Sequence, residues 1–298
     1  MTKSHFVKGL IVVILIVCSS VLSFAASDEQ SKPADLSPPG NPTQDHPLES
    51  FSGEFDRDYV MGYFPDAKTI VTAPARWEAA DWLTAVGVAG VTAGLYTQDG
   101  KIQNWAQKNK TSTADRIGDG ATSIGFGAYT LPLLGGLYLY GHLADDAKAR
   151  TTVLLAAESF VLTGVITQTI KFSAHRHRPY SGDPYHTWDG PGLSNASEKM
   201  SFPSGHASSA FAIATVVASE YENSFVVPPL AYGIASLTAM NRVLHNAHWT
   251  SDIFFGSAVG YFTGKMVVKS HDSSKKTNLM IVPVMDGKQA GLLMTYNY

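Results

Sequence analysis

Apolar residues along this chain gather in long segments that polar loops separate. Each segment is long enough for a helix, and together they cover residues 82–97, 121–143, 150–172, 205–221, 228–241 and 252–268. A more polar, amphipathic stretch at 102–117 predicts a further helix between the first two. The pattern therefore predicts an all-α fold, a helical bundle built on these six core segments.

The C-terminal tail has a different pattern. Leu279–Met285 and Gly291–Tyr298 are strand-like runs on either side of Asp286 and Gly287, a dipeptide typical of hairpin turns. Pro283 has no backbone N–H to donate, which places its strand at an edge. The tail therefore predicts a short β-hairpin.

The N-terminal residues have the order of a secretory signal. Lys3 and Lys8 precede an apolar run, Leu10–Leu22, which ends in small residues near Ala25. This order predicts a signal peptide and export to the periplasm or cell envelope of a Gram-negative bacterium, with an uncleaved anchor as the alternative. The single cysteine, Cys18, lies in this segment, so the exported chain would hold no disulfide.

The composition changes again before the first core helix. Residues 27–52 are rich in Pro, Ser, Asp and Gln and carry few aliphatic side chains, which is typical of a disordered leader. Aromatic residues and prolines follow at irregular spacing, in a segment that either packs on the bundle or contacts a membrane surface. The expected divisions are a signal peptide (1–26), a disordered leader (27–52), a lead-in segment (53–81), the helical domain (82–270) and a linker with the hairpin (271–298).

Composition and charge exclude two classes of protein. With 45% hydrophobic and 16% charged residues, the chain can bury a sizeable core, so it is not disordered as a whole. The net charge is −3 and the basic residues form no long run, which argues against nucleic acid as a partner.

The third apolar segment ends in two cations with a regular spacing. Lys171 and Arg178 are seven residues apart, which is two helical turns, and Pro179 follows directly. On its own, this pattern also suits two basic residues that interact with the dipole of a helix C-terminus.

Two further polar blocks lie near the last three apolar segments, one at the start of 205–221 and the other between 228–241 and 252–268. Ser204 can cap a helix that begins with Gly205 and His206. Arg242 is followed by His248 and, four residues later, by Asp252, a spacing that places both on one face if the last helix begins that early. Structural hydrogen bonds would explain each block separately. Together they supply three cations, two histidines, a carboxylate and a helix N-terminus, which are the groups needed to hold and transfer a phosphoryl group.

In order, spacing and helical context, these blocks resemble the three signature motifs of the type 2 phosphatidic acid phosphatase (PAP2) and vanadium haloperoxidase superfamily. The resemblance covers residues 82–269 and leaves out the leader and the hairpin. One departure is Asn241, where the family usually has serine before the arginine. Asn241 still offers a hydrogen-bond donor, so we expect a modified site rather than an inactive one.

The resemblance implies a role for each residue. His248 would be the nucleophile, with Asp252 holding its imidazole, and His206 would protonate the leaving oxygen. The remaining members would bind phosphate oxygens, and these are Lys171, Arg178, Ser204, Gly205 and Arg242. No metal or other cofactor is expected, although His175, His177, His186 and His245 lie in the same loops.

The expected function is a metal-independent phosphatase that hydrolyses phosphomonoesters or diphosphates of small molecules or lipids through a phosphohistidine. The alternatives are a vanadium-dependent haloperoxidase and a non-catalytic envelope protein on the same scaffold. If a cleaved signal exported the chain and every core helix spanned, Lys171 and Arg178 would face the cytoplasm. We therefore expect a periplasmic bundle with peripheral membrane contact, and an integral inner-membrane protein is the alternative.

Overall fold

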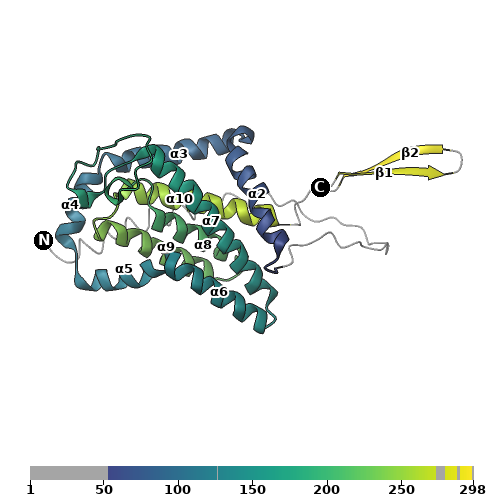
Figure 1. The fold of residues 1–298 in the computed structure, drawn as a ribbon, viewed down its shortest axis with the longest axis horizontal. Helices are drawn as coiled ribbons and strands as arrows, with labels where there is room; N and C mark the ends of the chain where they lie inside the picture. The colour runs from purple at the N-terminus through teal and green to yellow at the C-terminus, as the bar shows by residue number, and fades with distance from the viewer. Residues whose placement is uncertain (1–52, 126, 273–278, 287–288, 297–298) are drawn as a thin grey trace.

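A computed structural model of the protein describes residues 53–125, 127–272, 279–286 and 289–296. The signal peptide and leader predicted for residues 1–52 lie outside this part. The helices are α2 (Arg57–Thr72), α3 (Ala79–Tyr96), α4 (Asp99–Asn109), α5 (Ser112–Gly125), α6 (Gly127–Leu143), α7 (Ala147–Ala174), α8 (Gly205–Glu220), α9 (Val227–Leu244) and α10 (Thr250–His271), with short 3-10 turns at Ala73–Arg76, Pro179–Ser181 and Ser197–Lys199. The predicted all-α bundle is confirmed (Figure 1).

Helix α8 lies at the centre of the bundle, packed against α7, α9 and α10. Its Phe211 belongs to an apolar cluster with Val243 and Ile253, while its Val216 packs with residues of α7 and α10. Most of its other core residues are Ala, Ser or Thr. Because these side chains are small, the neighbouring helices approach the α8 backbone closely and hold its N-terminus in a fixed position.

A row of glycines on α10 makes the closest of these approaches possible. Gly256, Gly260 and Gly264 are spaced by four residues and so lie on one face of α10. A methyl group added at Gly260 would overlap the carbonyl oxygen of Ser208, and one at Gly256 would lie 2.6 Å from that of Ser204. The backbones of α8 and α10 are therefore in contact from Ser204 onward.

Gly260→Ala is accordingly expected to lower the free energy of unfolding by about 1–3 kcal/mol, since one of the two backbones must move. Chemical denaturation of the purified protein measures this change. Gly164→Ala on α7 is the matched control, because nothing lies within 4 Å of the added methyl group there. A loss no greater than that of the control would contradict the close packing.

Two predicted helix boundaries are wrong. The stretch 102–117 is not one helix, because α4 ends at Asn109 and the extended backbone of Lys110 separates it from α5. The apolar segment 121–143 is likewise divided between α5 and α6. Polar side chains of α5 face the end of α9 in this arrangement: Asn241 of α9 donates to Asp119 and Thr122 of α5.

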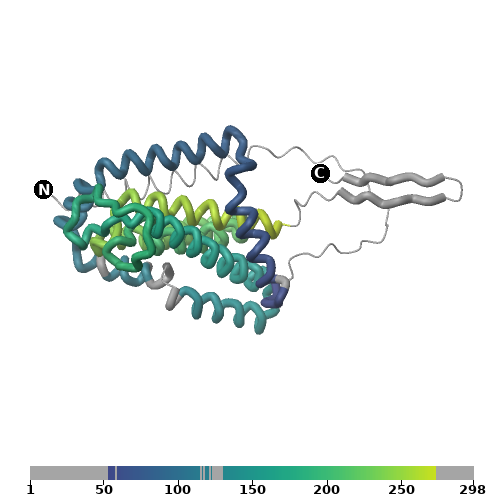
Figure 2. The backbone as a smooth tube through the Cα atoms, turned by 45° about the horizontal axis from the view of Figure 1, so that its top comes forward, coloured from purple at the N-terminus to yellow at the C-terminus, as the bar shows by residue number. Residues whose placement is uncertain are grey.

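The lead-in segment is more regular than its prolines suggested. It forms α2, which contains Pro65 and runs across the bundle near the end opposite to α4 (Figure 2). The hydroxyl of Tyr59 donates to the carbonyl oxygen of Leu154 on α7 at 2.8 Å, so the segment packs on the bundle.

Beyond α10, the backbone of β1 (Leu279–Asp286) runs antiparallel to that of β2 (Gln289–Tyr296), with Leu279 opposite Tyr296. The side chains of both strands lie outside the described part. The predicted C-terminal β-hairpin stays a prediction.

Candidate active site

Lys171, in the last turn of α7, and Arg178, four residues beyond its end, contact the same backbone oxygen. His175 takes a left-handed conformation, with φ of 42°, which ends α7 and turns the chain back over the bundle. Lys171 Nζ donates to the carbonyl oxygen of Met200 at 2.6 Å, and Arg178 Nη2 donates to the same oxygen at 3.2 Å. Arg178 Nε is buried without a hydrogen-bond partner, so it remains available to an anion.

The N-terminus of α8 lies beside this pair. Ser204 caps the helix, its hydroxyl oxygen accepting from the Ala207 N–H at 3.4 Å, while its own N–H donates to the carbonyl oxygen of Asp252. A methyl group added at Gly205 would meet nothing within 4 Å, so the space beside this backbone is open. The first turn of a helix carries unpaired N–H groups and a partial positive charge, which favour an anion there.

Arg242 comes from the last turn of α9 and is held by α5. Its Nη2 donates to the hydroxyl oxygen of Thr122 at 3.0 Å, and Asn241 Nδ2 donates to the same oxygen at 2.7 Å. Asn241 fits because position 118 is glycine, since a methyl group there would overlap the Asn241 side chain. Asn241 therefore anchors α9 to α5 rather than pointing at a bound anion.

His248 lies just before α10 and not on it, because that helix begins at Thr250. The condition for His248 and Asp252 to share a helical face, an earlier start of this helix, is therefore not met. His248 Nδ1 is 2.7 Å from the carbonyl oxygen of Ser201 and 3.8 Å from Asp252 Oδ2. A carbonyl only accepts, so Nδ1 carries the proton and Nε2 keeps the lone pair. The direct Asp252 hydrogen bond expected from the sequence is replaced by this backbone contact.

Arg176, which sequence reasoning missed, connects Asp252 to the rest of the fold. It is completely buried, with Nη1 2.5 Å from Asp252 Oδ1 and Nη2 2.8 Å from Asp99 Oδ2. The backbone N–H of Ser251 donates to Asp99 Oδ1, and the hydroxyl of Ser201 donates to Asp252 Oδ2. The same network thus holds Asp252 and the residue whose carbonyl orients His248.

The electrostatics of the site favour a bound anion. Burial, followed by the charges of Arg242, Arg178 and Lys171, lowers the pKa of His206 to about 4. Burial and the charge of Arg178 lower the pKa of Lys171 to about 7, and burial above all lowers that of His248 to about 3. A negative ligand among these groups would restore their ability to hold protons.

Asp252 differs from the other ionisable groups. Its burial raises its pKa, but the charge of Arg176, the nearby His248 imidazole and the hydrogen bond from Ser201 outweigh burial and keep that pKa below the usual range. The carboxylate is therefore ionised at neutral pH, where it can offset positive charge on the imidazole.

The loop after Arg178 is held by its own polar contacts. His175 bonds to the backbone oxygens of Gly190 and Ser194, each at 2.9 Å, and His177 pairs with Asp183 and Asp189. His245 pairs with Asp119 on α5. Within the described residues, none of these histidines forms a group of three ligands suited to a metal ion.

A cavity of about 350 Å³ lies beside the buried network. Helix α3 contributes Ala89, Thr92, Ala93 and Tyr96, and the other lining residues are Arg176, Trp188, Phe202, Ser251 and Phe255. Its walls are thus mainly apolar. None of the eight candidate site residues lines this cavity, but Phe202 and Ser251 are close in sequence to Ser204 and Asp252.

Comparisons with known proteins agree with the motif assignment. Residues 152–276, which include all eight candidate residues, match the family model of the PAP2 superfamily. The chain is 42% identical over 67 residues to a lipid A 1-phosphatase of Porphyromonas gingivalis, covering 22% of this chain and 15% of that protein's length.

Two crystal structures have partial similarity to this chain. LpxE of Aquifex aeolicus is 21% identical, with a TM-score of 0.46, over 57% of this chain and 94% of that one. A transmembrane PAP2 type phosphatidylglycerolphosphate phosphatase of Bacillus subtilis is 18% identical, with a TM-score of 0.44, over 74% of this chain and 96% of that one.

Proposed function

We propose, for a chain whose residues 152–276 belong to the PAP2 superfamily, that it hydrolyses phosphate esters or diphosphates of lipid-like molecules. The observation that carries the proposal is the arrangement of Lys171, Arg178 and Arg242 around the N-terminus of α8, with His248 beside them. Cations and unpaired N–H groups stabilise the charge that accumulates on phosphoryl oxygens during transfer.

The proposed reaction has two steps and uses no metal. His248 Nε2 attacks phosphorus, the bond from phosphorus to the ester oxygen breaks, and His206 gives that oxygen a proton. Water then attacks the phosphohistidine, His206 takes a proton from it, and inorganic phosphate leaves. Arg178 Nε and the open backbone at Gly205 are the donors placed to bind the phosphoryl oxygens.

The apolar cavity supports a substrate with a hydrophobic part. A small soluble phosphate ester would fill only the polar site, whereas a lipid phosphate could also place apolar groups between α3 and Phe255. The similarity to a lipid A 1-phosphatase points in the same direction.

Ala93→Trp, which places a large side chain in this cavity, is expected to separate the two substrate classes. Its kcat/KM for phosphatidate, isoprenoid diphosphate or lipid A should fall at least about tenfold, because the apolar contacts are lost. Its kcat/KM for p-nitrophenyl phosphate should stay unchanged. Release of inorganic phosphate in detergent measures both.

Ala80→Trp is the matched control, since Ala80 lies on the same helix but outside the cavity. Equal losses on lipid and soluble substrates in Ala93→Trp would contradict the assignment of the cavity. Absence of phosphate release from every substrate by the unaltered protein would contradict the proposed function itself.

We further propose that the outer faces of α3 and α6 contact the lipid of an envelope membrane. Many large apolar side chains are exposed there, including Trp82, Leu83, Val86, Leu133 and Leu139. Among the described helices, α7 is the one that is both long and apolar enough to cross a membrane. Large apolar side chains exposed in this number are costly in water.

The protein is therefore expected to sediment with membranes and to stay there in high salt, because salt screens charges but does not weaken apolar contacts. Detergent should release it. Replacing both Leu83 and Val86 with glutamine should move protein into the soluble fraction, whereas Lys101→Gln should not. Full release of the unaltered protein by salt would contradict the membrane contact.

A further inference from the structure

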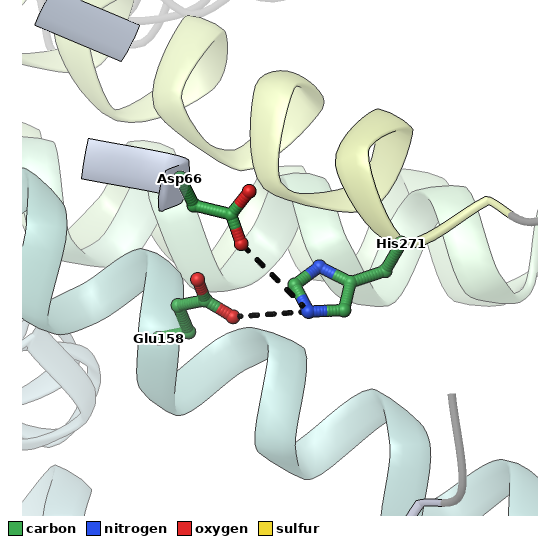
Figure 3. Close-up of side chains that lie close together, drawn as sticks. All are labelled: Asp66, Glu158 and His271. Atoms are coloured by element: carbon green, nitrogen blue, oxygen red, sulfur yellow. Dashed lines mark ion pairs between the residues drawn. The ribbon is translucent and has the colours of Figure 1, made fainter. Parts of the chain in front are cut away.

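A second group of ionisable side chains lies where α2, α7 and α10 meet. Asp66 comes from α2, Glu158 from the middle of α7, and His271 is the last residue of α10. All three side chains point toward one another (Figure 3). His271 Nε2 is 3.6 Å from Glu158 Oε2 and 3.8 Å from Asp66 Oδ2, and one ligand atom from each residue lies within 4.8 Å of the others.

Glu158 is the unusual member of this group. Its side chain is completely buried, and neither carboxylate oxygen has a hydrogen-bond partner. Within the described residues, no lysine or arginine forms an ion pair with Glu158 or Asp66. A buried carboxylate without hydrogen bonds is costly, so this arrangement calls for a positive partner.

The separations are too long for hydrogen bonds but suit a bound cation. Hydrogen bonds between nitrogen and oxygen normally measure about 2.7–3.2 Å. Ligands at about 2.0–2.1 Å from a tetrahedral Zn²⁺ lie roughly 3.4 Å from one another. The distances from His271 Nε2 to the two carboxylates exceed this value by only a few tenths of an ångström, and the carboxylate oxygens, which lie within 4.8 Å of one another, would have to approach by up to about 1.4 Å to coordinate one ion.

The hydrogen bond made by His271 Nδ1 also supports a cation at this cluster. Nδ1 lies 3.1 Å from the backbone oxygen of Val267, which can only accept, so this contact places the proton on Nδ1. The lone pair of Nε2 then points at the two carboxylates. Metal-binding histidines commonly donate their second N–H to a backbone carbonyl in this way.

We propose that Asp66, Glu158 and His271 bind a divalent transition-metal ion of the Zn²⁺ class, with water as a further ligand. One nitrogen and two carboxylate oxygens are ligands that Zn²⁺ accepts, and the two carboxylates balance its charge. The ion would join α2 to α7 and α10. Glu158 precedes Lys171 by 13 residues, about 20 Å along α7, so this ion would take no part in phosphoryl transfer.

The test uses the full chain, purified in detergent and freed of metal with a chelator. Titration calorimetry and elemental analysis after dialysis should find a single Zn²⁺ per chain and little binding of Mg²⁺ or Ca²⁺. Zn²⁺ should also raise the midpoint of thermal unfolding, because it binds the folded state. Glu158→Gln and His271→Gln should each weaken Zn²⁺ binding at least about tenfold.

Two matched variants complete the design. Glu220→Gln on α8 and His142→Gln on α6 remove the same chemical groups outside the cluster and should bind Zn²⁺ as the unaltered protein does. Glu158→Gln keeps the size of the side chain and removes a buried charge, so it should fold, and circular dichroism checks this. Failure of the unaltered protein to bind Zn²⁺, equal binding by folded Glu158→Gln, or preference for Mg²⁺ would each overturn the proposal. Phosphate release is not used as a readout, so a failure here leaves the proposed function standing.

Discussion

His248→Ala should abolish phosphate release, with a loss in kcat of at least about 10⁴-fold, the scale seen when a catalytic nucleophile is removed. In the proposed mechanism no neighbouring group can take over the attack on phosphorus. Lys171 and Arg178 already donate to the carbonyl oxygen of Met200, and His206 is assigned to protonate the leaving oxygen rather than to attack phosphorus. Steady-state kinetics with p-nitrophenyl phosphate measure the loss without dependence on lipid binding.

A chemical readout makes this test specific. Rapid quenching of the unaltered protein with labelled substrate should trap label on a histidine, and His248→Ala should trap none. His186→Ala is the control, because His186 is an exposed residue of the neighbouring loop and contacts Tyr185 rather than the site. Near-normal turnover by His248→Ala would refute the assigned nucleophile.

The motif residues could be predicted because their relation to one another is local. Lys171 and Arg242 lie in the last turns of α7 and α9, and Arg178 and His248 follow four residues beyond these helix ends, so only a short turn separates the members of each pair. Ser204 could be recognised as a helix cap from its own neighbours in the sequence. Helix class and site composition therefore follow from short-range patterns.

Contacts between distant segments could not be predicted in this way. Arg176 stands between two histidines and looks like one more polar loop residue, while its partner Asp99 is 77 positions away. Nothing local links them; the loop after α7 carries Arg176 to Asp99, the first residue of α4, and to Asp252 in the first turn of α10. The partner of His248 could not be predicted either, because it is the backbone oxygen of Ser201, and any residue type supplies such an oxygen.

Helix boundaries failed where a helical pattern continued across a break. The residues around position 110 keep a helical pattern on both sides, so hydrophobic periodicity alone joins α4 to the start of α5. The extended conformation of Lys110 interrupts the helix without glycine or proline. Thr122 then reaches Arg242 from α5, which shows why the break matters for the site.

Arg176→Met should lower the free energy of unfolding by about 3–5 kcal/mol, the usual cost of removing one partner from a buried ion pair. Asp99 and Asp252 would remain completely buried without their counter-charge. Burial would then raise the pKa of both carboxyl groups, since the charge of Arg176 would no longer oppose it. Chemical denaturation at neutral pH measures the loss, and Arg76→Met, at an exposed arginine, is the control.

A second substitution separates charge from packing. Adding Asp99→Asn to Arg176→Met removes one of the two uncompensated charges, so the double variant should recover part of the lost stability. Its activity should stay low, because Arg176 also holds Asp252 beside Ser201, whose carbonyl orients His248. Arg176 is thus a positioning residue, and the loss should appear in kcat more than in KM. Full recovery of turnover in the double variant would show that Arg176 contributes only to stability.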